Sequence, residues 1–328
     1  MRILITGGAG YVGSACLRHL AETGHGVLAY DNLREGHRGA VAGSCELVEA
    51  DILDGDTLRK TMRDFGPDAV MHFAAATYVG ESVEKPEYHY RNNIGGTQSV
   101  LDAMRDCDVA RLVFSSTCAT YGLATDEFLS EETPQVPASP YARTKLAVEW
   151  MIRDFSHAHG LGFTILRYFN ASGASPDGRH GEDHRPETHL VPLVLQVALG
   201  QREELAIFGT DYPTADGTCI RDYVHTSDLA SAHRLAVEAT EPGRGDVFNI
   251  GTGNGASVME IIEACRKVSG HAIPTRNEAR RAGDPPRLVA VPAKIKRELG
   301  WDPQYTAIEQ VVETAFRWHR DHPDGYRD

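Results

Sequence analysis

The apolar residues in the first half of the chain fall into short runs that alternate with longer amphipathic stretches. The short runs predict strands at residues 3–5, 27–30, 46–48, 69–73, 112–114 and 163–166. Between these runs, apolar positions recur at helical spacing near residues 12–22, 55–65, 83–105 and 141–159. This alternation is typical of βαβ units, so we predict an α/β fold with a doubly wound parallel sheet of the Rossmann type.

The pattern becomes irregular after residue 170. Residues 170–189 are rich in Gly, Pro, Asp, Glu and His and predict a long loop, which in a compact enzyme usually has a function. A helix is predicted near 190–200, a second polar loop at 209–221 and a strand at 247–251. We therefore predict a larger domain at 1–169, joined by a returning segment near 218–251, and a smaller α/β domain mainly at 170–328.

Composition and charge narrow the class of protein. The 328 residues are 41% apolar, and the net charge of −13 disfavours non-specific binding to nucleic acid or anionic lipid. No apolar run approaches the roughly 20 residues that cross a bilayer, and the N-terminus lacks the pattern of a signal peptide. The six cysteines are scattered, which favours reduced thiols over a disulfide or zinc framework. We expect a cytoplasmic protein without nucleic-acid or membrane partners.

Three glycines follow the first predicted strand and open the first predicted helix. Gly7, Gly10 and Gly13 have the spacing G-x-x-G-x-x-G. A tight turn without side chains lets the backbone N–H groups and the helix N-terminus meet a pyrophosphate. In this strand–turn–helix context, the pattern predicts a dinucleotide site.

A carboxylate near the end of the second predicted strand indicates which dinucleotide binds. Asp31 is placed to accept hydrogen bonds from the adenosine ribose hydroxyls and would repel the additional phosphate of NADP, so NAD is favoured. Arg34 and Arg38 lie close enough in sequence to keep NADP open. Asp51, after the third predicted strand, can either face the adenine or cap the next helix.

A tyrosine and a lysine four residues apart form the candidate catalytic pair. Tyr141 and Lys145 lie at the start of a predicted helix, where this spacing puts both side chains on one face. A lysine ammonium stabilises a nearby phenolate and lowers the phenol's pKa from about 10, which makes a usable base. Thr117 ends the predicted strand before them, at the sheet edge where open α/β sheets bind ligands, and can hydrogen-bond the same substrate oxygen.

Together these features resemble a known family. The glycine pattern, Asp31, HFAAA, the Ser-Ser-Thr strand end and YARTK resemble the extended short-chain dehydrogenase/reductases. VGESVEKP, RNNIGGT, LRYFNASGA, AIFGTDYPTADGT, IRDYVH and RRAGDPP narrow the resemblance to the UDP-glucose 4-epimerases. The resemblance extends over nearly the whole chain.

The resemblance implies an NAD-dependent isomerase that interconverts UDP-galactose and UDP-glucose through a 4-keto sugar. Tyr141 would take the proton of the 4-hydroxyl, Thr117 would hold its oxygen, and Lys145 would tune Tyr141 and bind the nicotinamide ribose. The larger domain would bind NAD and the smaller one the UDP-sugar. The implied cofactor-binding residues are Gly7, Gly10, Tyr11, Val12, Gly13, Asp31, Asn32, Asp51, Ile52, Phe73, Ala74, Ala75, Asn92, Ser115, Tyr141, Lys145 and Tyr168. The implied substrate-binding residues are Thr117, Asn170, His189, Leu190, Phe208, Arg221, Tyr223, Arg281, Asp284 and Leu288.

Three positions depart from the family pattern. Thr117 stands where many members have serine, and Thr77 stands where many carry a cofactor-binding lysine. Leu288 aligns with a position that limits room near the sugar's 2-substituent. A 4-epimerase of UDP-N-acetylglucosamine, UDP-glucuronate or a UDP-pentose therefore stays open, as does a UDP-glucuronate decarboxylase.

Two further functions are less favoured. A 4,6-dehydratase would place Asp-Glu after the active-site hydroxyl, whereas Thr117 is followed by Cys118 and Ala119. A non-catalytic NAD-sensing regulator should lack part of the hydroxyl–tyrosine–lysine set, which this chain retains.

The loop at 170–189 also carries a group of possible metal ligands. The loop lacks a recognised ligand spacing and the proposed chemistry needs no metal, so we expect none at His180, Glu182, Asp183, His184, Glu187 and His189.

The family resemblance implies a homodimer built through the helix that carries the catalytic pair. Val148, Met151, Ile152 and Phe155 fit either that interface or ordinary core packing.

Overall fold

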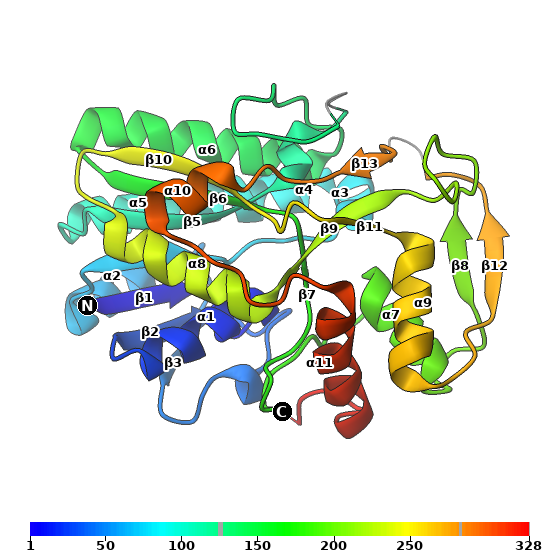
Figure 1. Ribbon diagram of the computed structural model, residues 1–328. Coiled ribbons are helices and arrows are strands. Elements are labelled where there is room, and N and C mark those ends of the chain that lie inside the picture. Colours follow the sequence, from blue (N-terminus) through cyan, green and yellow to red (C-terminus); the bar gives the residue numbers. More distant parts are fainter. Residues whose placement is uncertain (124–126, 282–283, 328) are drawn as a thin grey trace.

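A seven-stranded parallel sheet forms the centre of the larger part of the molecule (Figure 1). The computed structural model describes residues 1–123, 127–281 and 284–327. The strands run in the order β10-β6-β5-β4-β1-β2-β3, and their bounds are β1 Arg2–Thr6, β2 Gly26–Asp31, β3 Glu46–Glu49, β4 Ala69–His72, β5 Arg111–Thr117, β6 Gly162–Tyr168 and β10 Gly245–Ile250. The chain moves outward from β1 to β3 and then resumes on the other side of β1 at β4. Ligands bind at such a switch point, beyond the carboxyl ends of the strands.

Helices cover both faces of this sheet, as the doubly wound prediction requires. α1 (Tyr11–Glu22) and α8 (Thr226–Ala239) pack with Ile3 and Ile5 in one apolar core. Leu4 points to the other face and packs with α2 (Gly55–Phe65), α5 (Gly96–Asp106) and α6 (Pro140–His159). The alternation along β1 explains its uninterrupted apolar sequence, because both faces of the strand are buried.

The prediction of one continuous helix at 83–105 was wrong, because the chain leaves the helical conformation at Lys85 and contains a π-helical turn further on. The pieces are α3 (Val79–Glu84), α4 (Pro86–His89), the π-helical turn Tyr90–Gly95 and α5. Pro86 has no backbone N–H to continue the first piece. In the π-helical turn the buried Asn93 accepts a hydrogen bond from the Ala76 backbone N–H at 2.7 Å. π-helical turns often occur at functional sites, and this one carries Asn92.

The smaller part of the molecule lies beside the carboxyl edge of the sheet (Figure 1). It contains a four-stranded sheet of β7 (Asn170–Ser172), β9 (Ile220–His225), β11 (Gly255–Ser257) and β13 (Arg287–Leu288). This part also contains a pair of strands, β8 (Leu205–Phe208) and β12 (Thr275–Glu278), and the helices α7 (Leu190–Ala198), α9 (Val258–Ser269) and α11 (Ile308–Asp321). The remaining short helices, α10 (Ala293–Leu299) and the turns at 38–40 and 118–121, lie elsewhere.

Two predicted loops in this region contain strand residues. β7 lies within the predicted loop 170–189, and the first two residues of β9 overlap the end of the predicted loop 209–221. The two strands pair with each other, Asn170 opposite Tyr223 and Ser172 opposite His225. Such pairing joins residues far apart in sequence, so local periodicity cannot reveal it.

The described part of the chain contains no helix both long and apolar enough to span a bilayer.

A buried ion pair ties α6 to the sheet. Glu149 of α6 and Arg167 of β6 are 1% and 3% exposed, and the guanidinium donates to the carboxylate at 2.9 and 2.6 Å. Ser116 of β5 donates to the same carboxylate at 2.6 Å, and Arg167 also donates to the Tyr121 hydroxyl at 3.0 Å. The bidentate geometry fixes α6 against both β5 and β6.

We predict that Glu149→Ala lowers the free energy of unfolding by about 3 to 5 kcal/mol, because it leaves the Arg167 charge buried and unpaired. Chemical denaturation followed by circular dichroism measures the change. Lys60→Ala is the matched control, since Lys60 and Asp64 form a solvent-exposed pair at 2.7 Å that contributes little to stability. Equal losses in the two variants would contradict this account of the buried pair.

Candidate active site

A cavity of about 440 Å³ opens at the carboxyl edge of the seven-stranded sheet. It brings together residues from the ends of β1, β2, β4, β5 and β6, from the start of α6 and from β7, β9 and β13. The predicted residues that line it are Gly7, Gly10, Tyr11, Val12, Gly13, Asp31, Asn32, Ile52, Phe73, Ala74, Ala75, Asn92, Ser115, Thr117, Tyr141, Lys145, Tyr168, Asn170, His189, Arg221 and Leu288. One cavity thus gathers most of the predicted cofactor residues and half of the predicted substrate residues.

The glycine turn at the cavity floor depends on the absence of side chains. Gly7 has φ +73°, and a Cβ there would lie 2.5 Å from the Ala74 backbone nitrogen. A Cβ on Gly13 would lie 2.1 Å from the Gly7 carbonyl oxygen. At Gly10, the N-cap of α1, there is room for a side chain: an added Cβ would have the Gly7 carbonyl oxygen as its nearest neighbour, at 3.4 Å. The helix N-terminus therefore opens into the cavity, as an anion site requires.

Asp31 stands at the end of β2 beside this turn. Its two carboxylate oxygens accept hydrogen bonds from the Ala9 and Leu33 backbone N–H groups at 3.0 and 2.9 Å. Burial raises the pKa of Asp31, although these backbone hydrogen bonds act in the opposite direction. The carboxylate is thus held in place and retains acceptor capacity for ribose hydroxyls.

The two nearby arginines have other partners. Arg38 pairs with Glu49, and Arg34 lines the cavity with its guanidinium 4.1 Å from the centre of the Tyr88 ring. Asp51, among the described residues, lies just outside the cavity lining, where it accepts hydrogen bonds from Asn32 at 2.9 Å and from the Leu53 backbone N–H at 2.8 Å.

Thr117, Tyr141 and Lys145 meet inside the cavity. α6 begins at Pro140, after Ser139 caps it by accepting a hydrogen bond from the Ala142 N–H at 3.2 Å, and this places Tyr141 on its first turn. Tyr141 shares the cavity with Thr117 at the end of β5, whose hydroxyl lowers the pKa of the Tyr141 phenol. Lys145, 3% exposed, donates from Nζ to the Ser115 carbonyl oxygen at 2.8 Å.

Lys145 was expected to lower the pKa of Tyr141, and in the chain alone this expectation was wrong. Burial raises the pKa of Tyr141 to about 12, although the hydrogen bond with Thr117 lowers it. Burial lowers the pKa of Lys145 to about 7, partly opposed by the charge of Glu149. The lysine is therefore only partly charged at neutral pH, and a further positive charge is needed to favour the phenolate.

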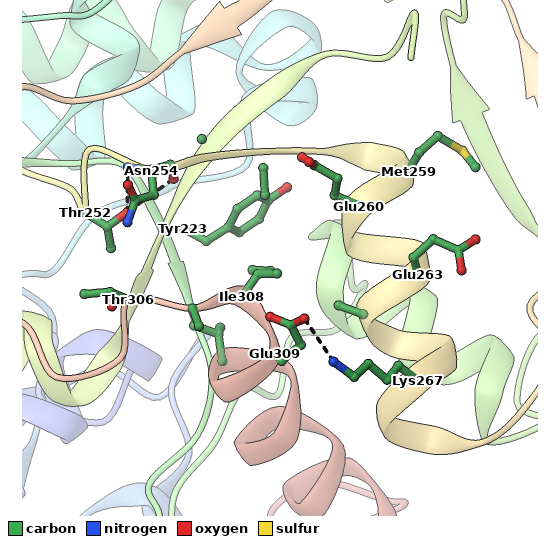
Figure 2. Close-up of a pocket in the computed structure, with 15 residues that line it drawn as sticks. Tyr223, Thr252, Asn254, Met259, Glu260, Glu263, Lys267, Thr306, Ile308 and Glu309 are labelled. Carbon is green, nitrogen blue, oxygen red and sulfur yellow. Dashed lines mark hydrogen bonds and ion pairs between the residues drawn. The ribbon is translucent and has the colours of Figure 1, made fainter. Parts of the chain in front are cut away.

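The other predicted substrate residues, all described, lie outside this cavity lining. Asp284 pairs with Arg221, which itself lines the cavity, and Arg281 stacks 4.2 Å from the centre of the Phe208 ring. Leu190 is the first residue of α7. Tyr223 lines a second cavity of about 560 Å³ between β9, α9 and α11, where Figure 2 shows its ring on the opposite side from Lys267 and Glu309.

Several residues that line the cavity were not predicted from the sequence to contact the cofactor or the substrate. They are Tyr30, Glu35, Gly36, Tyr78, Val79, Tyr88, Ala119, Phe169, Ala171, Glu182 and His184. Tyr88 lies within the predicted helix at 83–105, which obscured its position, and Tyr78 precedes α3, where no element was predicted. Glu182 and His184 carried a signal, since the sequence showed them within a group of potential ligands.

The comparisons with known proteins agree with this geometry. The sequence model of the NAD-dependent epimerase/dehydratase family matches residues 3–251. The chain belongs to that family. A UDP-glucose 4-epimerase of Halalkalibacterium halodurans is 50% identical over 327 residues, which cover 99% of this chain and 98% of the relative.

Two solved structures are similar to this epimerase/dehydratase family member over nearly their whole length. The UDP-glucose 4-epimerase of Brucella ovis, in complex with NAD, has a TM-score of 0.93 at 47% identity and covers 97% of this chain and 98% of its own. The enzyme of Bifidobacterium longum, in complex with NAD⁺ and UDP, has a TM-score of 0.95 at 33% identity, with 99% and 100% covered. NAD is the cofactor of the family, and the side-chain-free turn and Asp31 fit it.

The glycine turn gives a prediction about stability and cofactor binding. We expect Gly13→Ala to lower the free energy of unfolding by about 1 to 3 kcal/mol, because its Cβ would overlap the Gly7 carbonyl. Gly10→Ala is the matched variant, and it should change stability by less than about 1 kcal/mol but weaken NAD binding, since its Cβ enters the cavity. Denaturation and NAD titration of both proteins measure these effects. A stable Gly13→Ala protein with unchanged NAD affinity would contradict the role given to the turn.

Proposed function

We propose that the chain interconverts UDP-galactose and UDP-glucose by transient oxidation at sugar carbon 4. The observation that carries the proposal is that the Thr117 and Tyr141 hydroxyl groups lie in the cavity that also contains the glycine turn and Asp31. Two hydroxyls on one substrate oxygen suit the removal and return of a proton. The similarity to UDP-glucose 4-epimerases over the full chain supports the same reaction.

The chain's own groups handle the proton, while the cofactor handles the electrons. Oxidised NAD supplies the hydride acceptor at carbon 4 and a positive charge that favours the phenolate of Tyr141. Tyr141 takes the proton from the 4-hydroxyl as the carbon–oxygen double bond forms, and returns it after hydride comes back to the opposite face. Thr117 holds the oxygen through both steps, and Lys145 keeps the end of β5 in register with α6 through the Ser115 carbonyl.

The UDP portion needs firmer contacts than the sugar, because the sugar must turn between the two hydride transfers. Arg221 lines the cavity and is oriented by Asp284 and by the Ile220 carbonyl, to which it donates at 2.7 Å. A fork-shaped guanidinium held in this way suits a diphosphate. We propose that Arg221 binds the diphosphate, and that Arg281, Phe208, Leu190 and Tyr223 approach the substrate only when it is bound.

The dimer, the domain division and the cytoplasmic location predicted from the sequence stay predictions. Val148 and Ile152 pack in the core, so they are unsuited to an interface. α6 nevertheless presents Trp150, 58% exposed, and it packs against α3, which presents Val83 at 66% exposure. This exposed apolar surface supports a homodimer through α6, with NAD held by the domain at 1–169 and the UDP-sugar by that at 170–328.

The test of the proposed function is the conversion of UDP-galactose to UDP-glucose by the NAD-loaded protein. Tyr141→Phe should lower turnover by about 10²- to 10⁴-fold with NAD binding retained, because it removes the proton-transferring group. Tyr90→Phe, at an exposed position, should leave turnover unchanged. Parallel incubations with UDP-N-acetylgalactosamine, UDP-glucuronate and UDP-arabinopyranose rank the sugars, whose fit depends on Leu288. The proposal would be refuted if the NAD-loaded protein formed no 4-epimer from UDP-galactose or from any of the other three sugars.

A further inference from the structure

Four metal-ligating side chains converge in the segment before α7. Glu182, His184, Glu187 and His189 each bring one nitrogen or oxygen atom to a place where all four atoms lie within 4.8 Å of one another. His189 Nδ1 is 2.8 Å from a Glu182 oxygen and 3.0 Å from a Glu187 oxygen. His184 Nδ1 is 3.1 Å from Glu182 and 3.6 Å from Glu187. The irregular loop thus brings the four side chains into one compact group, although their spacing in the sequence matches no recognised metal-binding motif.

These separations match the edges of a small coordination tetrahedron. Zinc binds imidazole nitrogen and carboxylate oxygen at about 2.0 to 2.2 Å, which places tetrahedral ligand atoms roughly 3.3 to 3.6 Å apart. With one oxygen taken from each carboxylate, His189 Nδ1 is 2.8 Å from Glu182 and 3.0 Å from Glu187, and His184 Nδ1 is 3.1 Å from Glu182. These atoms would have to move apart by up to about half an ångström to hold the ion. Two imidazoles disfavour calcium and magnesium, which take oxygen ligands in larger number.

Hydrogen bonds alone leave two atoms of the group unsatisfied. Glu182 Oε1 and His184 Nδ1 are buried and, among the described residues, have no hydrogen-bond partner of acceptable geometry, although Oε1 lies 3.1 Å from His184 Nδ1 and 2.8 Å from His189 Nδ1. Glu182 is 4% exposed. Burying an acceptor and a ring nitrogen without partners is costly, whereas a cation placed between them would satisfy both lone pairs.

The ligand-bearing backbone is already fixed. The Trp318 indole donates to the Glu182 carbonyl at 3.0 Å, and a Glu187 carboxylate oxygen accepts from the Thr188 and His189 N–H groups at 2.7 Å each. The Tyr11 ring meets the edge of His184, with ring centres 6.0 Å apart. A site whose ligands are held by their surroundings binds metal with little loss of conformational entropy.

We propose that Glu182, His184, Glu187 and His189 bind one divalent transition-metal ion of the zinc class. Two carboxylates and a dication are neutral together, and four protein ligands fill a tetrahedron, so the ion has a structural role. Three of the ligands line the active-site cavity, which means that the ion would fix the wall formed by residues 182–189. Hydride transfer does not use the ion, and His189, which the family resemblance assigns to the substrate, would serve the ion instead.

The test is metal binding by the NAD-loaded full chain after chelator treatment and dialysis. Calorimetric titrations with Zn²⁺, Co²⁺, Mg²⁺ and Ca²⁺, and elemental analysis after gel filtration, give affinity and stoichiometry. We expect one equivalent of Zn²⁺ or Co²⁺, with the intense visible absorption of tetrahedral Co²⁺, and no binding of Mg²⁺ or Ca²⁺. Glu182→Gln and His184→Asn should each weaken Zn²⁺ binding by at least about tenfold.

The matched control is an ordinary surface pair of the same chemistry. His25 and Glu238 lie 3.2 Å apart outside the group, and His25→Asn should leave the stoichiometry and affinity unchanged. Circular dichroism and NAD titration identify any variant that fails to fold, and the Co²⁺ spectrum of the unmodified protein needs no variant. The proposal is overturned if Zn²⁺ does not bind stoichiometrically, if Mg²⁺ binds as well as Zn²⁺, or if His25→Asn removes the binding.

Discussion

The buried ion pair between Glu149 and Arg167 holds the catalytic helix to the strands that complete the active site. Lys145 and Tyr141 lie about one and two turns N-terminal to Glu149 on α6. Ser115 and Thr117 lie at the end of β5, and Ser116 between them ties that strand to the same carboxylate. A side chain on a helix and a hydroxyl on a strand can share one substrate oxygen only if the two elements keep a fixed separation. The charge pair supplies that constraint from inside the core, where water cannot weaken it.

Burial has opposite effects on the two members of the catalytic pair. It raises the pKa of Tyr141 to about 12 and lowers that of Lys145 to about 7, so the chain alone holds a neutral phenol beside a partly charged lysine. In the proposed mechanism, proton removal at neutral pH therefore depends on the charge brought by the oxidised cofactor. The arrangement couples the base to the redox state: the phenolate is favoured when hydride can be accepted and the phenol when hydride is to be returned.

The sheet and the cofactor turn could be predicted from sequence because their signals are local. Ile3 to Ile5 are buried on both faces, and Gly7 and Gly13 are required by close contacts with the backbone of Ala74 and of Gly7. The break at Pro86 and the π-helical turn escaped prediction, since the register of Asn93 is set by Ala76 and Thr144 of other elements. The pairing of β7 with β9 and the convergence of Glu182 with His189 depend likewise on tertiary contacts. Family resemblance supplied substrate positions, and the structure places only half of them in the cavity lining.

The central claim is that hydride leaves and returns to the same sugar carbon without exchange with water. The most direct measurement uses UDP-galactose carrying deuterium at carbon 4, converted by the NAD-loaded protein in ordinary water and analysed by NMR. The account predicts UDP-glucose with the deuterium retained at carbon 4, because the label travels as hydride to the bound cofactor and back. Loss of the label to water, or solvent hydrogen appearing at carbon 4, would contradict it and indicate a proton-abstraction mechanism instead.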